Sequence, residues 1–145
     1  MSSHIEQHTF DPWQAIVAHQ QHAALDKQFG ATATFIGSMR DFNDDADVSH
    51  MVLEHYPAMT QRYLEQLEQQ AKQRWSLLDI LIIHRVGSID PADAIVLIAC
   101  WSAHRRAALD ACNWLIEELK HKAPFWKKET RHDGERWVES NTNGL

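Results

Sequence analysis

Basic side chains cluster at two places in the second half of the chain. The first cluster, His104, Arg105 and Arg106, comes where the segment "SAHRRAALDA" predicts that a helix begins. Free N–H groups give a helix N-terminus partial positive charge, so these cations do not stabilise the helix itself. A bound phosphate or carboxylate would make the arrangement favourable. The alternative is that these side chains pair with the aspartates of residues 41 to 47 or extend into solvent.

The second cluster lies in "LKHKAPFWKKE", at the end of the same predicted helix and just beyond it. Lys120 and Lys122 are favourable at a helix C-terminus for their own sake. Lys127 and Lys128 have no such explanation. A lysine beside buried aromatic rings can have a lowered pKa and act as a proton donor, proton acceptor or nucleophile, and the alternative is a stem that packs while the ammonium stays in water.

The distance between the two clusters constrains how they can act together. A helix from 103 to 121 is about 27 Å long, because each residue adds ~1.5 Å. One small ligand cannot reach both ends within a single chain. If both clusters serve one pocket, a second copy of the chain must supply one of them, and a symmetric dimer is the simplest arrangement.

Three helices are predicted to position these groups. The first covers "DPWQAIVAHQQHAALDK", with Asp11 as N-cap and Pro12 at the first helical position. The second covers "PAMTQRYLEQLEQQAKQRW", where apolar residues recur every four positions from Met59. The third extends from Ser102, a plausible N-cap, to His121, and Pro124 halts its pattern.

Short β-prone runs separate the helices. Strands are predicted over residues 31–37, 48–56, 77–86, 94–101 and 135–140. The first two are expected to form a hairpin or loop-linked pair across an acidic turn, and "APFW" is expected to be a turn. Because helices and strands do not alternate regularly, an α+β fold is predicted, with helices packed on a mixed or mainly antiparallel sheet.

Composition bounds the class of protein. A chain of 145 residues that is 44% hydrophobic predicts a single domain over residues 1–145. The longest apolar run, "AIVLIAC", is too short for a membrane span, and the polar start lacks the apolar segment of a signal peptide, so a cytoplasmic protein is expected. The net charge of −6 argues against a general nucleic-acid binder.

The cysteines and several histidines have plain structural interpretations. Cys100 and Cys112 lie in apolar surroundings without a CxxC pair and are expected to be buried thiols, with a catalytic or persulfide-carrying cysteine as the alternative. The other histidines lack a metal-ligand pattern such as HExxH. Metal binding is therefore not expected, and His50, His55 and His84 are interpreted as satisfied residues of the sheet.

Six segments follow one another along the chain: "FIGSMRDFN", "LEHYPAM", "IIHRVGSI", "SAHRRAAL", "LKHKAPFWKKE" and "GERWVE". Together they resemble the MoaE family, the large catalytic subunits of molybdopterin synthase. The resemblance extends from about Phe29 to Glu139. It implies a MoaE-like α/β hammerhead-type fold and a central homodimer. It also implies a heterotetramer, in which each end of the dimer binds a small ubiquitin-like sulfur carrier (MoaD-like) by its C-terminal Gly-Gly thiocarboxylate.

The resemblance also implies roles for individual residues. Lys120 and Lys127 match the catalytic lysines, and a neighbouring subunit is expected to contribute His104 and Arg105. The implied substrate-binding residues are Ser38, Met39, Arg40, His104, Arg105, Lys120, Lys127, Lys128 and Glu129.

The activity implied by the resemblance is a sulfurtransferase of molybdenum cofactor biosynthesis. Sulfur passes twice from the carrier's thiocarboxylate to cyclic pyranopterin monophosphate and forms the dithiolene of molybdopterin. The carrier supplies the sulfur, so no cofactor is expected, and neither nucleic acid nor a membrane is expected as partner. The alternative is a non-catalytic dimeric adaptor that binds a ubiquitin-like partner or an anionic ligand.

Overall fold

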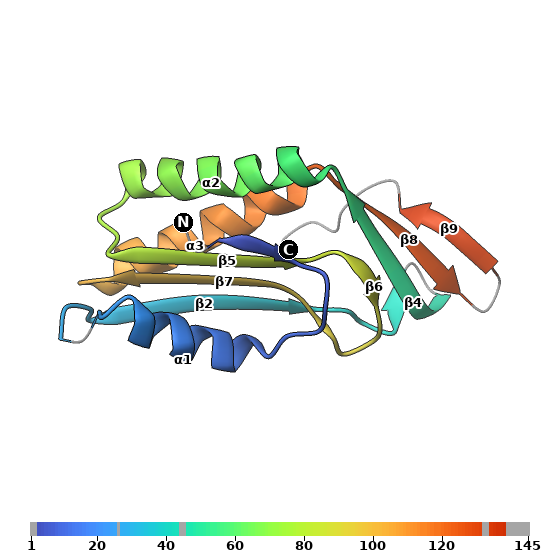
Figure 1. The fold of residues 1–145 in the computed structure, drawn as a ribbon, viewed down its shortest axis with the longest axis horizontal. Coiled ribbons are helices and arrows are strands. Elements are labelled where there is room, and N and C mark those ends of the chain that lie inside the picture. Colours follow the sequence, from blue (N-terminus) through green and yellow to red (C-terminus); the bar gives the residue numbers. More distant parts are fainter. Residues whose placement is uncertain (1–2, 26, 44–45, 132–133, 139–145) are drawn as a thin grey trace.

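A computed structural model describes residues 3–25, 27–43, 46–131 and 134–138. These residues form three helices and nine strands (Figure 1). The helices are α1 (Pro12–His22), α2 (Pro57–Arg74) and α3 (Arg105–Lys122). The strands are β1 (His4–Glu6), β2 (Ala31–Ser38), β3 (Phe42–Asn43), β4 (Ala46–His55), β5 (Asp79–Arg85), β6 (Gly87–Ile89), β7 (Ala94–Ser102), β8 (Phe125–Arg131) and β9 (Gly134–Val138).

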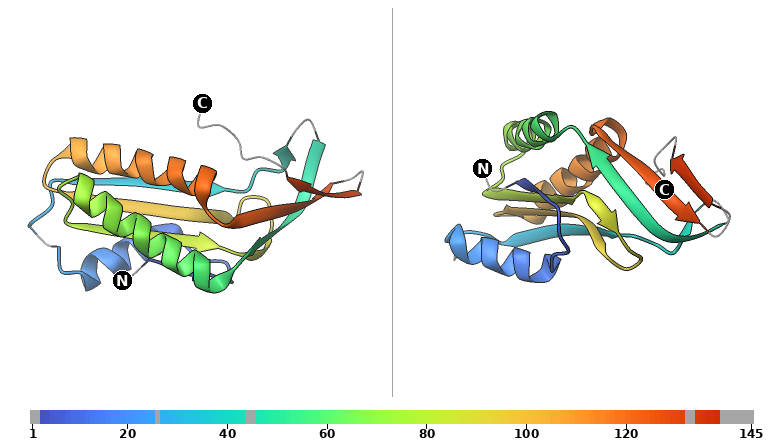
Figure 2. Two further views of the ribbon diagram at one scale, coloured as in Figure 1. Left: turned by 90° about the horizontal axis from the view of Figure 1, so that it is seen from above. Right: turned by 45° about the vertical axis from the view of Figure 1, so that its right-hand side comes forward.

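The first sheet is the central layer of the molecule. Its strand order is β1-β5-β7-β2, in which β1 and β5 are parallel and the other pairs are antiparallel. Helices α2 and α3 cover one face and α1 covers the other (Figures 1 and 2). Successive residues of β5 therefore point to different cores: Ile80 and Ile82 pack toward α2 and α3, whereas Leu81 and Ile83 pack toward α1. The predicted α+β fold with a mixed sheet is confirmed.

The second sheet lies at one end of the first. It has the order β3-β4-β8-β9, and β6 also pairs with β4. The predicted pairing of strands 31–37 and 48–56 is wrong, because β2 pairs with β7 and β4 pairs with β8. The backbone of Met39 explains the separation. Its N–H donates to the Asp93 carbonyl and its own carbonyl accepts from the Ala92 N–H, both at 2.9 Å, which holds the end of β2 against the turn before β7.

Two further expectations are corrected at the element boundaries. The segment "APFW" is not a turn throughout, since β8 begins at Phe125 directly after Pro124. The N-cap of α3 is His104, because Ser102 still belongs to β7, where it is paired with Ala31. The Ser102 hydroxyl donates to the His104 carbonyl and so fixes the passage from strand to helix.

Helix α2 is confirmed in position, whereas α1 begins at Pro12 as predicted but ends at His22, before the predicted end at Lys27. The Asp11 carboxylate accepts the N–H groups of Trp13 and Gln14 at 3.0 and 3.3 Å, which caps α1 as its sequence predicted. In α2 the buried stripe contains Leu64, Leu67 and Ala71. Met59, expected on the same face, is 58% exposed because it lies on the first turn beyond the core.

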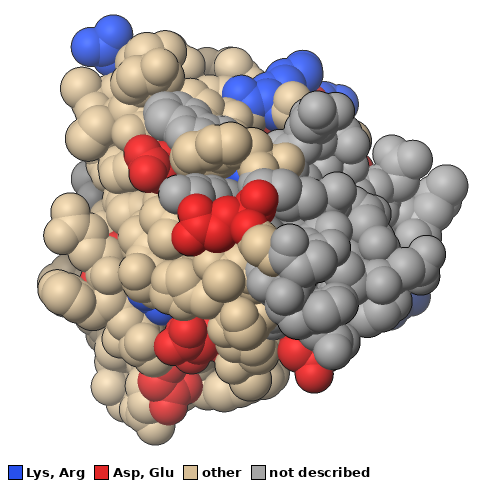
Figure 3. All heavy atoms as spheres, turned by 90° about the vertical axis from the view of Figure 1, so that its right-hand side faces the viewer, with Lys and Arg blue, Asp and Glu red and all other residues tan. Residues whose placement is uncertain are grey.

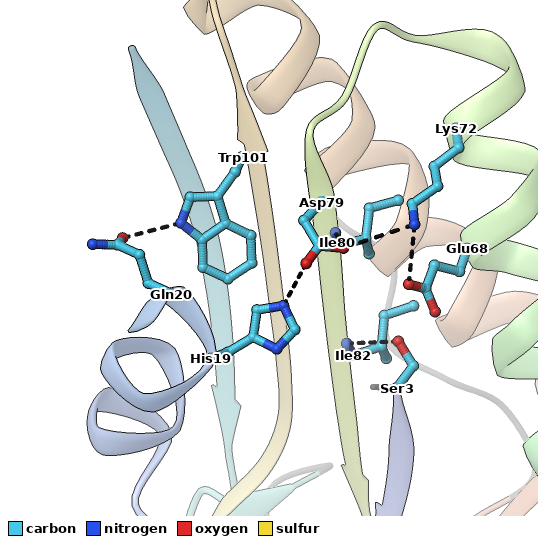
Figure 4. Close-up of polar contacts among 9 residues, drawn as sticks. All are labelled: Ser3, His19, Gln20, Glu68, Lys72, Asp79, Ile80, Ile82 and Trp101. Carbon is cyan, nitrogen blue, oxygen red and sulfur yellow. Dashed lines mark hydrogen bonds and ion pairs between the residues drawn. The ribbon is translucent and has the colours of Figure 1, made fainter. Parts of the chain in front are cut away.

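A polar network at the beginning of β5 connects the helical layers (Figure 4). Asp79 accepts a hydrogen bond from His19 Nε2 of α1 at 2.7 Å. The ammonium of Lys72 in α2 lies 3.7 Å from the same carboxylate and 3.6 Å from buried Glu68. Burial alone would raise the pKa of Asp79, but hydrogen bonds from His19 and from the Ile80 N–H outweigh it and lower the pKa. The network therefore ties α1 and α2 to one strand from opposite faces.

In the described part of the chain, no helix is long and apolar enough to cross a bilayer.

Candidate active site

A pocket opens where the C-terminal end of α3 meets both sheets. The empty space there is about 580 Å³ when the solvent at its open mouth is included. Residues from β2, β4, β5, β7, α3 and β8 line it: Gly37, Ser38, Leu53, His84, Ile95, Val96, Ile116, Leu119, Lys120, Ala123, Phe125 and Lys127. Most of these side chains are apolar, so the few polar groups determine which ligands can bind.

The structure brings Lys120 and Lys127, the two lysines predicted to be catalytic, to this pocket. Lys120 is in the last turn of α3 and Lys127 is on β8. Burial lowers the pKa of Lys120, and the nearby Arg40 charge lowers it further, against a smaller opposite effect of Glu117. An ammonium that loses its proton more easily is suited to proton transfer during a reaction.

The segment after β2 divides between the pocket and the core. Ser38 lines the pocket, and Arg40, exposed just beyond it, is close enough to influence Lys120. Met39 points elsewhere: it is buried with Met51, Leu53 and Ile89 between the two sheets. Met39 therefore supports this segment by packing and does not line the pocket, contrary to its predicted place among the substrate-binding residues.

His104 and Arg105 lie at the opposite end of α3 and are exposed. Arg105 and Lys120 are fifteen positions apart, which corresponds to about 22 Å along the helix axis. Within one chain, the two predicted basic clusters therefore do not share a site. The side chains of Lys128 and Glu129, also predicted to bind substrate, lie outside the described part of the structure, although their backbones pair with Val52 and Met51 of β4.

His84 is a pocket residue that the sequence interpretation missed. Its Nδ1–H donates to the Arg85 carbonyl at 2.8 Å, and its ring stacks on Phe125 with centroids 3.9 Å apart. Burial lowers the pKa of His84 to about 4, and the charges of Lys127 and Lys120 act in the same direction. One signal was present in the sequence: His84 is on the same face of β5 as Ile80 and Ile82, at the strand end nearest the lysines.

A glycine keeps one wall of the pocket thin. A Cβ at Gly37 would lie 2.9 Å from Cγ1 of Val96 and 3.1 Å from the ring of Phe35, which is closer than side chains normally approach. Because Gly37 lines the pocket from β2, any side chain there would displace the β7 wall or fill the space.

The cysteines lie in the core between the first sheet and α3, as expected for buried thiols. The pKa of Cys100 is raised by its interaction with Cys112 and by burial, which disfavours the thiolate. Neither is among the residues that line the pocket.

Among the described residues at this end of the molecule, Lys and Arg side chains lie mostly on the side of the helices. In Figure 3, described Lys and Arg side chains gather mostly along the upper border, on the side of α2 and α3, whereas Asp and Glu occupy the middle and lower parts. The last turn of α3 contains three basic residues, Lys120, His121 and Lys122. Among the described residues, no three His, Cys, Asp or Glu side chains are grouped so that they could hold a metal ion.

Comparisons with known proteins agree with this architecture. The family model described as "MoaE protein" matches residues 5–122. A molybdopterin synthase catalytic subunit from Pseudomonas aeruginosa is 47% identical over 140 residues, which cover 96% of this chain and 91% of that protein. A solved MoaE protein from Burkholderia ambifaria superimposes with a TM-score of 0.80 at 40% identity, covering 99% of this chain and 92% of the other.

A second similar structure is a complex. It contains subunits 1 and 2 of molybdopterin-converting factor from Helicobacter pylori, and the match has a TM-score of 0.81 at 24% identity, covering 100% of this chain and 95% of that one. At this identity the likeness shows the shared fold. The family model and the Pseudomonas relative each cover most of the sequence, and on that ground the chain belongs to the MoaE family.

Proposed function

We propose that this chain is the sulfur-transferring large subunit of a molybdopterin synthase. The observation that carries this proposal is the meeting of Lys120 and Lys127, from α3 and β8, at one pocket whose other walls are mostly apolar. The name of the Pseudomonas relative, a molybdopterin synthase catalytic subunit, supports it.

The proposed sulfur donor is a small ubiquitin-like carrier with a C-terminal Gly-Gly thiocarboxylate. The Helicobacter complex of two converting-factor subunits supports a partner of this kind. The proposed acceptor is cyclic pyranopterin monophosphate. Both reactants are anions, and a pocket with two lysines, beside Arg40, offsets their mutual repulsion.

In each transfer, residues of this chain donate a proton to the leaving oxygen and stabilise the negative charge that develops on it. The thiocarboxylate sulfur forms a bond to a pterin side-chain carbon while the bond from that carbon to oxygen breaks. The Lys120 ammonium donates a proton to the departing oxygen, and Lys127 stabilises the negative charge that develops there. Water then cleaves the resulting thioester, which leaves sulfur on the pterin and a carboxylate on the carrier tail. Two carriers react in turn, and no cofactor takes part.

A second copy of the chain completes the proposed site. His104 and Arg105 lie about 22 Å from Lys120 along α3, so they reach a shared substrate only from a neighbouring subunit. Leu109, one turn after Arg105, is 57% exposed and provides apolar surface beside these cations for such a contact. In this arrangement Arg40, His104 and Arg105 hold the phosphate, and Ser38 contributes a hydroxyl. A cytoplasmic location stays a prediction from the sequence.

The catalytic proposal is tested by single-turnover sulfur transfer from a thiocarboxylated carrier to the cyclic pterin. Lys120→Ala is expected to slow transfer by about 100-fold or more, because it removes the proton donor. Lys122→Ala is the matched control: Lys122 is in the same turn of α3, but its ammonium pairs with Glu118 at 3.0 Å. Near-normal transfer by Lys120→Ala would contradict the proposal and favour a binding adaptor.

The shared site is tested by mixing two inactive subunits. His104→Ala and Lys120→Ala damage different halves of the proposed site, so a random mixture should recover about one quarter of the wild-type activity through intact sites in mixed dimers. A mixture that stays inactive although the subunits exchange would contradict a site shared between two copies.

A further inference from the structure

The imidazole of His84 is held in one tautomer and one orientation. Its Nδ1–H donates to the Arg85 carbonyl at 2.8 Å, and a carbonyl can only accept, so the proton must be on Nδ1. The ring lies on the face of Phe125 with an interplanar angle of 13°. His55 stacks on the same phenyl ring at 6.2 Å between centroids. Nε2 is therefore left as a fixed hydrogen-bond acceptor on a residue that lines the pocket.

The charge state of the His84 ring allows Nε2 to accept a hydrogen bond. Burial lowers the pKa of His84 to about 4, so the imidazole is neutral at physiological pH and its Nε2 lone pair is available. The neighbouring charges of Lys127 and Lys120 also disfavour a second proton on the ring.

Apart from His84, the charged side chains among the described lining residues are hydrogen-bond donors. Lys120 and Lys127 can only donate when charged, and Ser38 is exposed at the mouth. The other described lining residues are apolar or glycine, so His84 supplies the buried side-chain acceptor among them. A peptide tail that enters such a pocket brings backbone N–H groups, and each buried N–H needs an acceptor.

We propose that His84 is a positioning residue that accepts, at Nε2, a hydrogen bond from a backbone N–H of the carrier's Gly-Gly tail. This inference rests on the proposed function, since it assumes that a glycine tail enters the pocket. The hydrogen bond fixes the depth and rotation of the tail, and the terminal sulfur-bearing group then lies between the ammonium groups of Lys120 and Lys127.

Two substitutions separate positioning from a merely structural role. In His84→Asn the short amide can still donate to the Arg85 carbonyl but does not reach the place of Nε2. In His84→Gln the longer amide presents an acceptor near the place of Nε2 but gives up the inner hydrogen bond. Titration calorimetry with the carrier in its carboxylate form should show binding weakened about 10-fold by His84→Asn and nearly unchanged for His84→Gln. The reverse order, or unchanged binding by His84→Asn, would overturn the proposal.

A change in the carrier tail tests the same hydrogen bond, between a tail N–H and His84 Nε2, by removing its donor. A semisynthetic carrier with N-methylglycine at the last or the penultimate position lacks one N–H at a time. One of the two is expected to bind wild-type protein about 10-fold more weakly, and His84→Asn should show no further loss with that carrier. An equal penalty in both proteins would overturn the role of His84.

If His84→Asn does not fold, wild-type protein and His84→Gln still test the proposal. Both should bind the unmethylated carrier tail more tightly than one of the methylated tails. Absence of any carrier binding by wild-type protein would overturn the proposed function together with this inference. Carrier binding that is insensitive to methylation at both positions would overturn this inference only.

Discussion

The buried imidazole of His84 should make the stability of the protein depend on pH. In the unfolded chain a histidine has a pKa near 6.5, whereas in the folded protein the pKa of His84 is lowered to about 4. Between these values the unfolded state binds more protons than the folded state, so the free energy of unfolding falls as pH falls. The contribution of His84 is fully present above pH 6.5 and is lost by about pH 4. Its size is about 3 kcal/mol, since one pKa unit corresponds to about 1.4 kcal/mol.

Urea unfolding at intervals between pH 7.5 and 4.5 measures this effect in wild-type protein and in His84→Gln. His55 and the other titrating groups are common to both, so the difference between the two curves isolates His84. Wild-type stability should fall by about 2 to 3 kcal/mol more than that of His84→Gln across this range. Parallel curves would show that His84 gains its proton equally easily in both states, and the reasoning about its buried environment would be refuted.

Three further expectations follow from the packing. Gly37→Ala should lower the free energy of unfolding by about 1 to 3 kcal/mol and slow sulfur transfer, because the new Cβ would lie 2.9 Å from a side-chain atom of Val96 in β7. An unchanged melting temperature together with unchanged transfer would contradict this. Asp79→Asn should lower the free energy of unfolding in urea by about 1 to 3 kcal/mol, because it weakens the hydrogen bond to His19. Sulfur transfer should stay intact, since Asp79 is at the end of β5 far from the pocket. A large loss of transfer in folded protein would contradict the view that Asp79 acts on stability alone. Replacing Cys100 and Cys112 together by serine should preserve transfer from a thiocarboxylated carrier, and a loss beyond about 10-fold in folded protein would indicate that sulfur passes through a thiol.

Local signals predicted most of the elements. Asp11 and Pro12 mark the start of α1 because capping and the fixed φ of proline act within one turn. The start of α3 was placed too early because Ser102 has the chemistry of an N-cap, but pairing with Ala31 keeps it in β7. That pairing joins residues far apart in the sequence, and local spacing carries no information about it.

The same limit applies to β8 and to the division into two sheets. The segment that begins at Phe125 follows a proline and is rich in charge, which favours a turn when read alone. It becomes a strand because β4, at least seventy residues earlier in the sequence, pairs with it from His55↔Phe125 onward. Strand partners of this kind depend on the whole fold.

The candidate site shows a similar division. That Lys120 and Lys127 lie near each other could be predicted because only six residues separate them in the sequence. His84 was missed because a histidine at the end of an apolar strand has the same local pattern whether it faces a filled core or a ligand pocket. The distinction depends on Phe125 and the lysines, which come from other elements.

The short connection between α3 and β8 has a consequence for how this protein can vary. Lys120 and Lys127 are joined by a helix end, Ala123, Pro124 and the first residues of a strand, so their spacing is set by a few consecutive peptide units. Insertions or deletions elsewhere in the polypeptide leave the length of this connecting segment unchanged. Relatives can therefore lengthen or shorten their outer loops and still present two amines at the same separation.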